Sequence, residues 1–292
     1  PIPNLSPEEN IFKLHAVNPL ALTRVLKSTT NMIFVITLDE NSAQSRNLRN
    51  YFTKASLEQI ENDTINFSLG QKNEFAKNQE VLYLYAKSED VLIRRLQENR
   101  EVLQEYFNKI ERQRMARKLY SGKKKKRVAR NLKKEMGFSI DIPYGYELAE
   151  SSDDFVWFRN AGDKFDKNIF VSFINYDSEQ LFSPNSIAEW RTNISKQYIM
   201  EDGPDSFLAI DSLNMPYITT PIKFGKGYTK KVQGWWQTNT ITMGGPFLSY
   251  VTLDPETNRL YYIEGFLYAP GQNKREMLRE LDVIIHTFKS GS

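Results

Sequence analysis

The chain has 292 residues, of which 40% are hydrophobic and 13% aromatic, and its formal net charge is +3 at pH 7. This composition is typical of a folded globular protein, and the length is enough for one large domain or two ordinary ones. The chain contains no cysteine, which excludes disulfides, thiol catalysis, iron–sulfur clusters and cysteine-ligated zinc. It also has no run of 18 or more apolar residues, so the sequence predicts no transmembrane helix.

The charge is distributed unevenly along the chain. Residues 112–134 contain twelve Lys or Arg and no acid, and removing these twelve charges from the net +3 leaves −9 for the rest. The sequence therefore describes a mildly acidic protein with one basic segment. Such a segment attracts anionic lipid, nucleic acid or an acidic partner.

The first half of the chain mixes strand and helix signals. Residues 1–30 are interrupted by proline and predict an extended lead-in. Two apolar runs, 31–38 and 81–86, have the length of buried strands. Between them, helical spacing predicts a helix over 45–55, and alternation predicts a strand over 64–69.

A long helix is predicted over residues 88–119. Ser88 is a favourable N-cap, and the two acids that follow it suit the positive end of the helix dipole. Ser121-Gly122 ends the helix, and a second, short helical segment runs to Met136-Gly137. Because charge and glycine coincide here, we expect a domain boundary at this point, with domains over 31–136 and 137–292.

The second half is rich in strands. The predicted strands cover residues 138–142, 154–159, 168–176, 217–224, 228–239 and two aromatic-rich segments on either side of Asp254-Pro255. Ser183-Pro184 predicts the start of a helix, and Asn273 with Glu276 resembles a capping box for the last helix. The predicted class is α+β: a small α/β unit that ends in a long helix, then a mainly antiparallel sheet flanked by helices.

No catalytic motif is evident. The two histidines, His15 and His286, have no third partner nearby in sequence, which disfavours a histidine-based triad or zinc site. The glycine pairs at 225–227 and 244–245 precede strands, whereas a phosphate-binding loop precedes a helix. The sequence predicts no metal site and no cofactor.

Glu264 is the one weak catalytic candidate. It lies inside the apolar strand 260–268, where a carboxylate must be paired or protonated. One interpretation is an acid or base in a pocket. The other is a carboxylate that points into a groove or meets an arginine.

Trp235, Tyr250 and Glu264 are the candidate ligand-binding residues. Adjacent strand residues face opposite ways, so Trp236 is expected in the core and Trp235 on a face with polar neighbours. An aromatic side chain in that position is typical of a ligand or interface contact. The alternative is that the helix predicted after Ser183 covers Trp235.

The basic segment supplies the other candidate site. We expect Lys123, Lys124, Lys125, Lys126 and Arg127 to contact an anionic surface, unless they are a solvated loop. The segment lacks the interleaved aromatic residues of single-strand nucleic-acid binders, so nucleic acid is an unlikely partner.

The C-terminal motifs resemble an uncharacterised family, the domain of unknown function 4837 family. The resemblance is carried by Gly244-Gly-Pro-Phe-Leu-Ser-Tyr250 and Tyr262-Ile-Glu-Gly-Phe-Leu-Tyr-Ala-Pro270, with Phe138-Ser-Ile-Asp-Ile-Pro143 upstream. It spans about residues 31–288 and its motifs are structural, so it implies no catalytic residue.

The resemblance implies a location and a general role. Members are typically exported lipoproteins of Bacteroidetes-type bacteria, acylated on a cysteine upstream of the folded part. The chain begins at Pro1 without a methionine, and we expect that an export segment has been removed. The leading hypothesis is a non-catalytic envelope protein that binds a ligand, another envelope protein or an anionic membrane.

A second resemblance concerns the second half alone. Ile142-Pro-Tyr-Gly-Tyr146 after a strand, and a final helix that ends in His286-Thr-Phe-Lys289, are similar to PsbP-like α/β/α sandwiches. These serve mostly as binding or assembly modules, and the likeness concerns fold alone.

Overall fold

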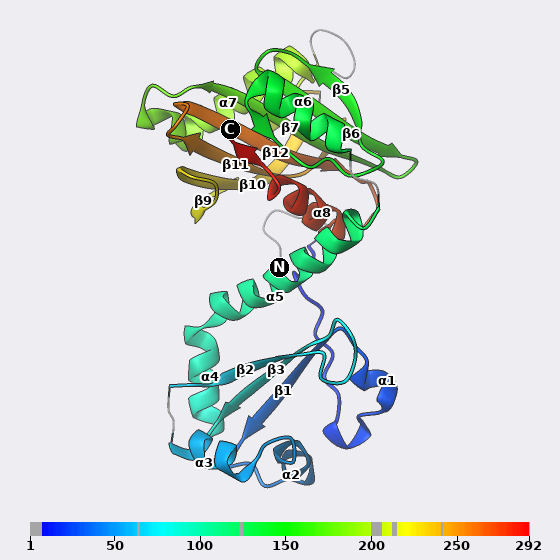
Figure 1. Cartoon of the computed structure of the whole chain (residues 1–292), viewed down its shortest axis with the longest axis vertical. Helices are drawn as coiled ribbons and strands as arrows, with labels where there is room; N and C mark the ends of the chain where they lie inside the picture. The colour runs from blue at the N-terminus through cyan, green and yellow to red at the C-terminus, as the bar shows by residue number, and fades with distance from the viewer. Residues whose placement is uncertain are drawn as a thin grey trace. The chain divides into compact units, whose positions relative to one another are not determined.

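A computed structural model describes residues 8–62, 65–122, 125–199, 206–211, 215–240 and 242–291. Packing divides the chain into two units (Figure 1): one is Lys13–Asn108, and the other combines Pro1–Phe12 with Lys109–Ser292. The domain limits predicted at residues 30 and 136 stay a prediction, because a packing unit is not the same as an independently folding domain. The mixture of helices with a large antiparallel sheet confirms the predicted α+β class.

The unit Lys13–Asn108 contains a small mixed sheet. Its elements are η1 (Pro19–Ala21), α1 (Arg24–Lys27), β1 (Asn31–Thr37), α2 (Ala43–Arg49), α3 (Lys54–Asn62), β2 (Ser68–Lys72), β3 (Glu80–Ala86), α4 (Glu89–Glu98) and the start of α5 (Arg100–Leu119). The strand order is β1-β3-β2, with β1 parallel and β2 antiparallel to β3. The two apolar runs predicted as buried strands are therefore neighbours in this sheet.

Aromatic packing fills the core of this unit. Phe34 of β1 stacks on Tyr51 and on Tyr83 of β3, with ring centroids 5.0 and 5.1 Å apart. The helix predicted over 88–119 is interrupted at Asn99, whose side chain donates to the carbonyl of Arg95 at 2.9 Å. Asparagine competes for backbone groups in this way, so it ends α4 where apolar periodicity alone predicted continuity.

The other unit is built on one large antiparallel sheet. Its elements are α6 (Lys126–Met136), β4 (Phe138–Ser139), β5 (Glu147–Ser151), β6 (Phe155–Gly162), β7 (Phe165–Asn175), η2 (Glu179–Phe182), α7 (Pro184–Tyr198), β8 (Leu208–Ile210), β9 (Ile218–Lys223), β10 (Tyr228–Thr238), β11 (Gly244–Asp254), β12 (Arg259–Tyr268), α8 (Arg275–Ile285) and β13 (Lys289–Ser290). The strand order is β5-β6-β7-β12-β11-β10-β8, and β9 also pairs with β10. The aromatic-rich strands β11 and β12 lie at its centre.

Helices cover both faces of this sheet (Figure 1). On the α7 face, Ile187 and Ile194 of the helix pack with Trp236 of β10 in one apolar cluster. On the α8 face, residues of α6 and α8 pack with Ile263 of β12 and Phe138 in another. Because strand residues alternate between faces, successive side chains of β10, β11 and β12 point toward one helix-covered face and then the other.

The start of α8 corrects a prediction. The helix begins after Lys274, which makes no side-chain capping bond, so the predicted Asn273 capping box is wrong. Glu9 supplies the cap instead: its carboxylate accepts hydrogen bonds from the backbone nitrogens of Lys274 and Arg275 at 2.6 and 3.1 Å. A carboxylate satisfies the free N–H groups and suits the positive helix end.

Candidate functional site

Glu264 lies in a closed ion pair. Its side chain is fully buried, and Arg191 of α7 is 2% exposed. Arg191 Nε lies 3.0 Å from both carboxylate oxygens, and Nη2 donates to Oε1 at 2.8 Å. The Tyr262 hydroxyl donates to Oε2 at 3.0 Å, and Phe247 stacks under the guanidinium at 4.7 Å. Every charge in this cluster is therefore matched inside the fold.

This environment decides between the two interpretations of Glu264. Acid–base catalysis needs a carboxyl group that a substrate can reach. Here the carboxylate meets an arginine in the core between α7 and the sheet. The acid–base hypothesis required an open pocket at Glu264, and the structure shows a closed core there. The ion pair instead links α7 to β12.

The three predicted ligand-binding residues do not converge. Strand register aligns Glu264 with Ser249 on the α7 face, whereas Tyr250 aligns with Ile263 on the α8 face. Trp235 shares the α8 side and is half-buried. The alternative that α7 covers Trp235 is wrong, because α7 packs on Trp236 and the opposite face.

Tyr250 belongs to a buried polar cluster. Its hydroxyl donates to Asp282 Oδ1 of α8 at 2.5 Å, and Arg112 Nη1 lies 3.9 Å from Oδ2. Burial by itself would raise the pKa of Asp282. The charges of Lys231, His286 and Arg112 and the Tyr250 hydrogen bond outweigh burial and hold that pKa below its usual value. Tyr250 thus positions α8 rather than opening onto a ligand.

The five residues predicted to contact an anionic surface differ in their structural environment. Lys123 and Lys124 lie outside the described residues. Lys125 donates to Glu147 at 2.8 Å and to a backbone carbonyl, so the fold holds it. Lys126 and Arg127 are exposed at the start of α6.

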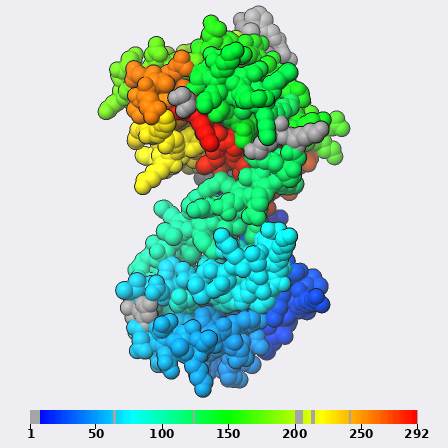
Figure 2. Space-filling model, viewed as in Figure 1, coloured from blue at the N-terminus to red at the C-terminus, as the bar shows by residue number. Residues whose placement is uncertain are grey.

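The exposed side of α6 carries a cluster of positive charges without ion-pair partners among the described residues. Its five cations are Lys126, Arg127, Arg130, Lys133 and Lys134. None of the five makes an ion pair within the described part of the chain. The opposite side of the helix buries Leu132 and Met136 in the α8-face core, which fixes the cations outward. In Figure 2 this segment, in green, forms open surface beside the red C-terminal residues.

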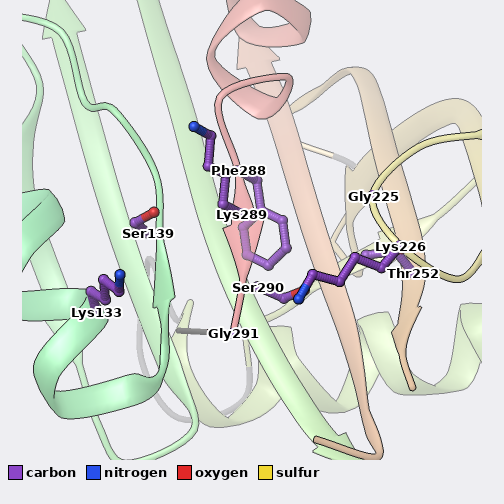
Figure 3. Close-up of a pocket in the computed structure, with 9 residues that line it drawn as sticks. All are labelled: Lys133, Ser139, Gly225, Lys226, Thr252, Phe288, Lys289, Ser290 and Gly291. Atoms are coloured by element: carbon purple, nitrogen blue, oxygen red, sulfur yellow. The ribbon is translucent and has the colours of Figure 1, made fainter. Parts of the chain in front are cut away.

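A groove of about 300 Å³ adjoins these cations (Figure 3). Its lining residues come from α6, the β4–β13 pair, the β9–β10 turn and β11: Lys133, Ser139, Gly225, Lys226, Thr252, Phe288, Lys289, Ser290 and Gly291. In Figure 3, Lys226 extends across the groove toward Ser290, and Lys133 approaches from the other side. Three ammonium groups and three hydroxyls thus surround a volume at the small end for ligand sites.

The β9–β10 turn determines where Lys226 lies. Gly225 has a φ of +65°, which favours glycine, and a Cβ there would meet the Thr252 hydroxyl oxygen at 3.3 Å. Lys226 pairs with Glu256, and this hydrogen bond raises the pKa of Lys226 above its usual value. Both partners are largely exposed, so an incoming anion can replace Glu256 at little cost.

A buried acid beside the groove, Asp254, also attracts Lys226. Asp254 is 1% exposed, and its oxygens accept from the Glu256 backbone nitrogen and the Thr257 hydroxyl, both at 3.0 Å. An anion such as a phosphate can bind there through ammonium and hydroxyl groups, in competition with Asp254 and Glu256 for Lys226. Sequence reasoning missed this site because its residues come from segments up to 158 positions apart, from Lys133 to Gly291. The only local signal was the cluster of cations near Lys133.

The described residues offer neither a metal site nor a membrane span. No group of three or more His, Asp or Glu side chains among them is arranged to hold a metal ion. Within the same residues, no helix combines the length and the apolar character needed to cross a bilayer.

Comparison with solved structures finds distant likenesses. The Ran-binding protein Mog1p of Saccharomyces cerevisiae is 8% identical, with a TM-score of 0.33 over 52% of this chain and 89% of its own. The human StarD13 (DLC2) lipid transfer and protein localization domain is 7% identical, with a TM-score of 0.18 over 48% and 89%. Similarities this low support no conclusion about function, and the predicted PsbP-like resemblance stays unconfirmed.

Comparison with protein families is more informative. No curated protein matches the chain. Residues 1–120 match a domain of unknown function, DUF8532. Residues 124–287, more than half of the chain, match the domain of unknown function DUF4837 and include α6, the large sheet and α8. The chain therefore belongs to the DUF4837 family, as its C-terminal motifs predicted.

Proposed function

We propose that this protein is a non-catalytic binding module that recognises anionic groups through α6 and the adjacent groove. The observation that carries the proposal is the set of five α6 cations without an acidic partner among the described residues. Exposed cations usually lie near acids of the same chain, because opposite charges attract. A row of unpaired cations beside a groove lined with hydroxyls supports an external anion as the missing partner.

The two parts of the site have different roles in this proposal. The α6 cations attract an anionic surface over a distance of about 8–10 Å, the Debye length at physiological salt. The groove then receives one anionic group, such as a phosphate, between Lys133 and Lys226. A lipid headgroup and a soluble phosphate ester both present such an anionic group. Binding experiments are therefore needed to distinguish these two partners.

We also propose that the protein is exported and anchored to the cell envelope by a lipid. The support is the resemblance of its C-terminal motifs to lipoproteins. Labelled palmitate should be incorporated into the full-length gene product, which should fractionate with the envelope. Recovery of unlabelled protein in the soluble cytoplasmic fraction would overturn this location.

Vesicle binding tests the proposal that α6 contacts an anionic membrane surface. The full chain should bind vesicles of phosphatidylcholine mixed with phosphatidylglycerol and should not bind phosphatidylcholine alone. Each cation near an anionic surface contributes about 1 kcal/mol. The triple variant Arg127→Gln/Arg130→Gln/Lys134→Gln should therefore bind roughly a hundredfold more weakly.

A matched variant controls for net charge. Lys54, Lys77 and Lys87 are exposed lysines of the other packing unit, and changing all three to Gln removes the same three charges. This control should bind vesicles nearly as well as the natural chain. If both triple variants lost vesicle affinity equally, net charge alone would explain the loss, and a specific site at α6 would be contradicted. Tighter binding to duplex DNA than to vesicles would favour nucleic acid instead.

A further inference from the structure

A second groove, of about 260 Å³, opens on the α7 face of the large sheet. Strand register aligns Asp166 with Tyr268 and Asn168 with Phe266, so these four side chains share one face. Arg159 of β6 pairs with Asn168 and also lines the groove. This groove is separate from the anion-binding groove, which involves other elements and the opposite helix layer.

Asp166 has an unmet hydrogen-bond acceptor beside this groove. The residue is 8% exposed, and Arg159 Nε donates to its Oδ2 at 2.7 Å. Its Oδ1 is buried and accepts no hydrogen bond from the part of the chain that the structure describes. A buried carboxylate oxygen without a donor is rare and destabilising, so it requires a specific explanation.

Asn168 provides a complementary donor two residues along the same strand. It is 2% exposed, and its Oδ1 accepts from Trp157 Nε1 at 2.9 Å. Indole nitrogen can only donate, so this bond fixes which way the amide points. The amide nitrogen then faces away from Trp157, and it has no hydrogen-bond partner among the described residues. One free acceptor and one free donor thus stand side by side.

The remaining lining is partly apolar, and the exposed β6–β7 turn adds the charged residues Asp163 and Lys164. The larger apolar lining residues are Phe165, Trp236, Met243, Phe266, Tyr268 and Pro270. Such a combination of apolar surface with a few placed polar groups is typical of small-molecule sites. The volume is below the usual range for drug-sized ligands, so it suits one ring rather than an extended chain.

The chemistry of these groups narrows the ligand class. Arg159 neutralises the Asp166 carboxylate, and the other two charged lining residues, Asp163 and Lys164, are opposite in sign, so the four charges cancel and the groove favours neither a cation nor an anion. A peptide strand would need free backbone groups, but β7 and β12 are each paired on both sides. A hydroxyl group both donates and accepts, which matches the adjacent Asp166 and Asn168 atoms. The apolar carbon face of a ring would then lie on the aromatic wall.

We propose that this groove binds a neutral, hydroxyl-rich ring, namely a sugar residue. A ring hydroxyl donates to Asp166 Oδ1, and a neighbouring oxygen accepts from the Asn168 amide. This site goes beyond the anion-binding function and uses none of its residues. The two proposals can therefore fail independently.

Saturation-transfer NMR on the full chain tests the sugar site. The probes are the methyl glycosides of glucose, galactose and mannose, and N-acetylglucosamine. At least one should show saturation transfer and a millimolar dissociation constant. Asp166→Asn keeps the side-chain shape but replaces the free acceptor with a donor, and should weaken binding about tenfold or more.

Two further variants keep the test decisive. Tyr268→Leu removes part of the aromatic wall and should weaken the same sugar if Asp166→Asn does not fold. Asp177→Asn changes an exposed acid outside the groove and should leave binding unchanged. Absence of saturation transfer from all four probes, or equal binding by the natural chain and Asp166→Asn, would overturn the proposal.

Discussion

Two groups of charged residues in the large-sheet unit, the Arg191–Glu264 pair and the cations of α6, differ in burial and in pairing. In the α7 layer, Arg191 and Glu264 are buried together and satisfy each other. On α6, five cations are exposed, and none of them pairs with an acid of the described chain. The same unit thus contains one closed electrostatic cluster and one open one.

This difference separates structural charge from functional charge. A buried ion costs several kcal/mol of desolvation unless a partner compensates it, so burial requires pairing. An exposed cation stays hydrated and has no such requirement, so it remains available to an external partner. We therefore conclude that the buried Arg191–Glu264 pair stabilises the fold, whereas the exposed cations of α6 are available to bind an anionic partner.

The largest predicted effect is at the buried pair. Arg191→Met leaves Glu264 buried without its cation and should lower the free energy of unfolding by about 3–5 kcal/mol, measured by urea denaturation. The double variant Arg191→Met/Glu264→Leu removes both charges and should recover most of this loss.

Lys196→Met is the matched control on the same helix. Its ammonium is exposed and lies 4.6 Å from the Phe207 ring, so its removal should cost less than about 1 kcal/mol. If Arg191→Met cost no more than this control, the α7 layer would not be the closed structural cluster that we describe.

The next effect concerns the Tyr250–Asp282 hydrogen bond and has a definite pH dependence. Tyr250→Phe should cost about 1.5–3 kcal/mol at neutral pH, because a buried carboxylate loses a donor. The folded pKa of Asp282 lies below its unfolded value of about 3.9. Its contribution is therefore fully present above that value and is lost as pH falls through the folded pKa.

The stability difference between Tyr250→Phe and the natural chain should accordingly shrink in acid. Urea denaturation between neutral pH and about pH 3 measures this difference. Tyr144→Phe is the control, since Tyr144 is 83% exposed. A difference that stays constant with pH would show that the lost stability does not depend on the Asp282 charge.

A smaller effect is predicted for the cap of α8. Glu9→Ala should lower the free energy of unfolding by about 1 kcal/mol, because two backbone N–H groups lose their acceptor. Glu8→Ala removes the neighbouring exposed carboxylate and should be nearly neutral. Equal stability of the two variants, measured in parallel by denaturation, would mean that Glu9 does not cap the helix.

The smallest predicted effect on stability concerns the exposed Lys226–Glu256 pair of the anion-binding groove. Glu256→Gln frees Lys226 from its exposed partner and should leave stability almost unchanged. It should strengthen binding of anionic vesicles severalfold, because one more cation of the groove becomes available. Weaker vesicle binding in this variant would contradict the role given to Lys226.

Sequence patterns predicted the main elements but not their contacts. Continuous apolar runs and alternation located β1, β3, β7 and β10–β12, since burial on one or both faces imposes those patterns. The edge strand β5 was missed because all five of its residues are exposed. The Glu9 cap was missed because it joins residues 265 positions apart.

The candidate site shows the same limit. Sequence reasoning identified Glu264 as a buried carboxylate, but its partner Arg191 lies on another element 73 positions away. It also located the cations near Lys126, yet the groove depends on Lys226 and Ser290 from distant strands. Local periodicity cannot predict contacts between such distant segments, because tertiary packing brings them together.

NMR titration of the full chain with glycerol 3-phosphate distinguishes an anion-binding groove from structural charge. We expect saturable amide shift changes at Ser139, Gly225, Ser290 and Gly291, around the anion-binding groove. We expect none at Arg191 or Glu264, whose charges are already paired in the α7 layer. The absence of changes in the groove, or changes equally spread over all exposed lysines, would contradict the account.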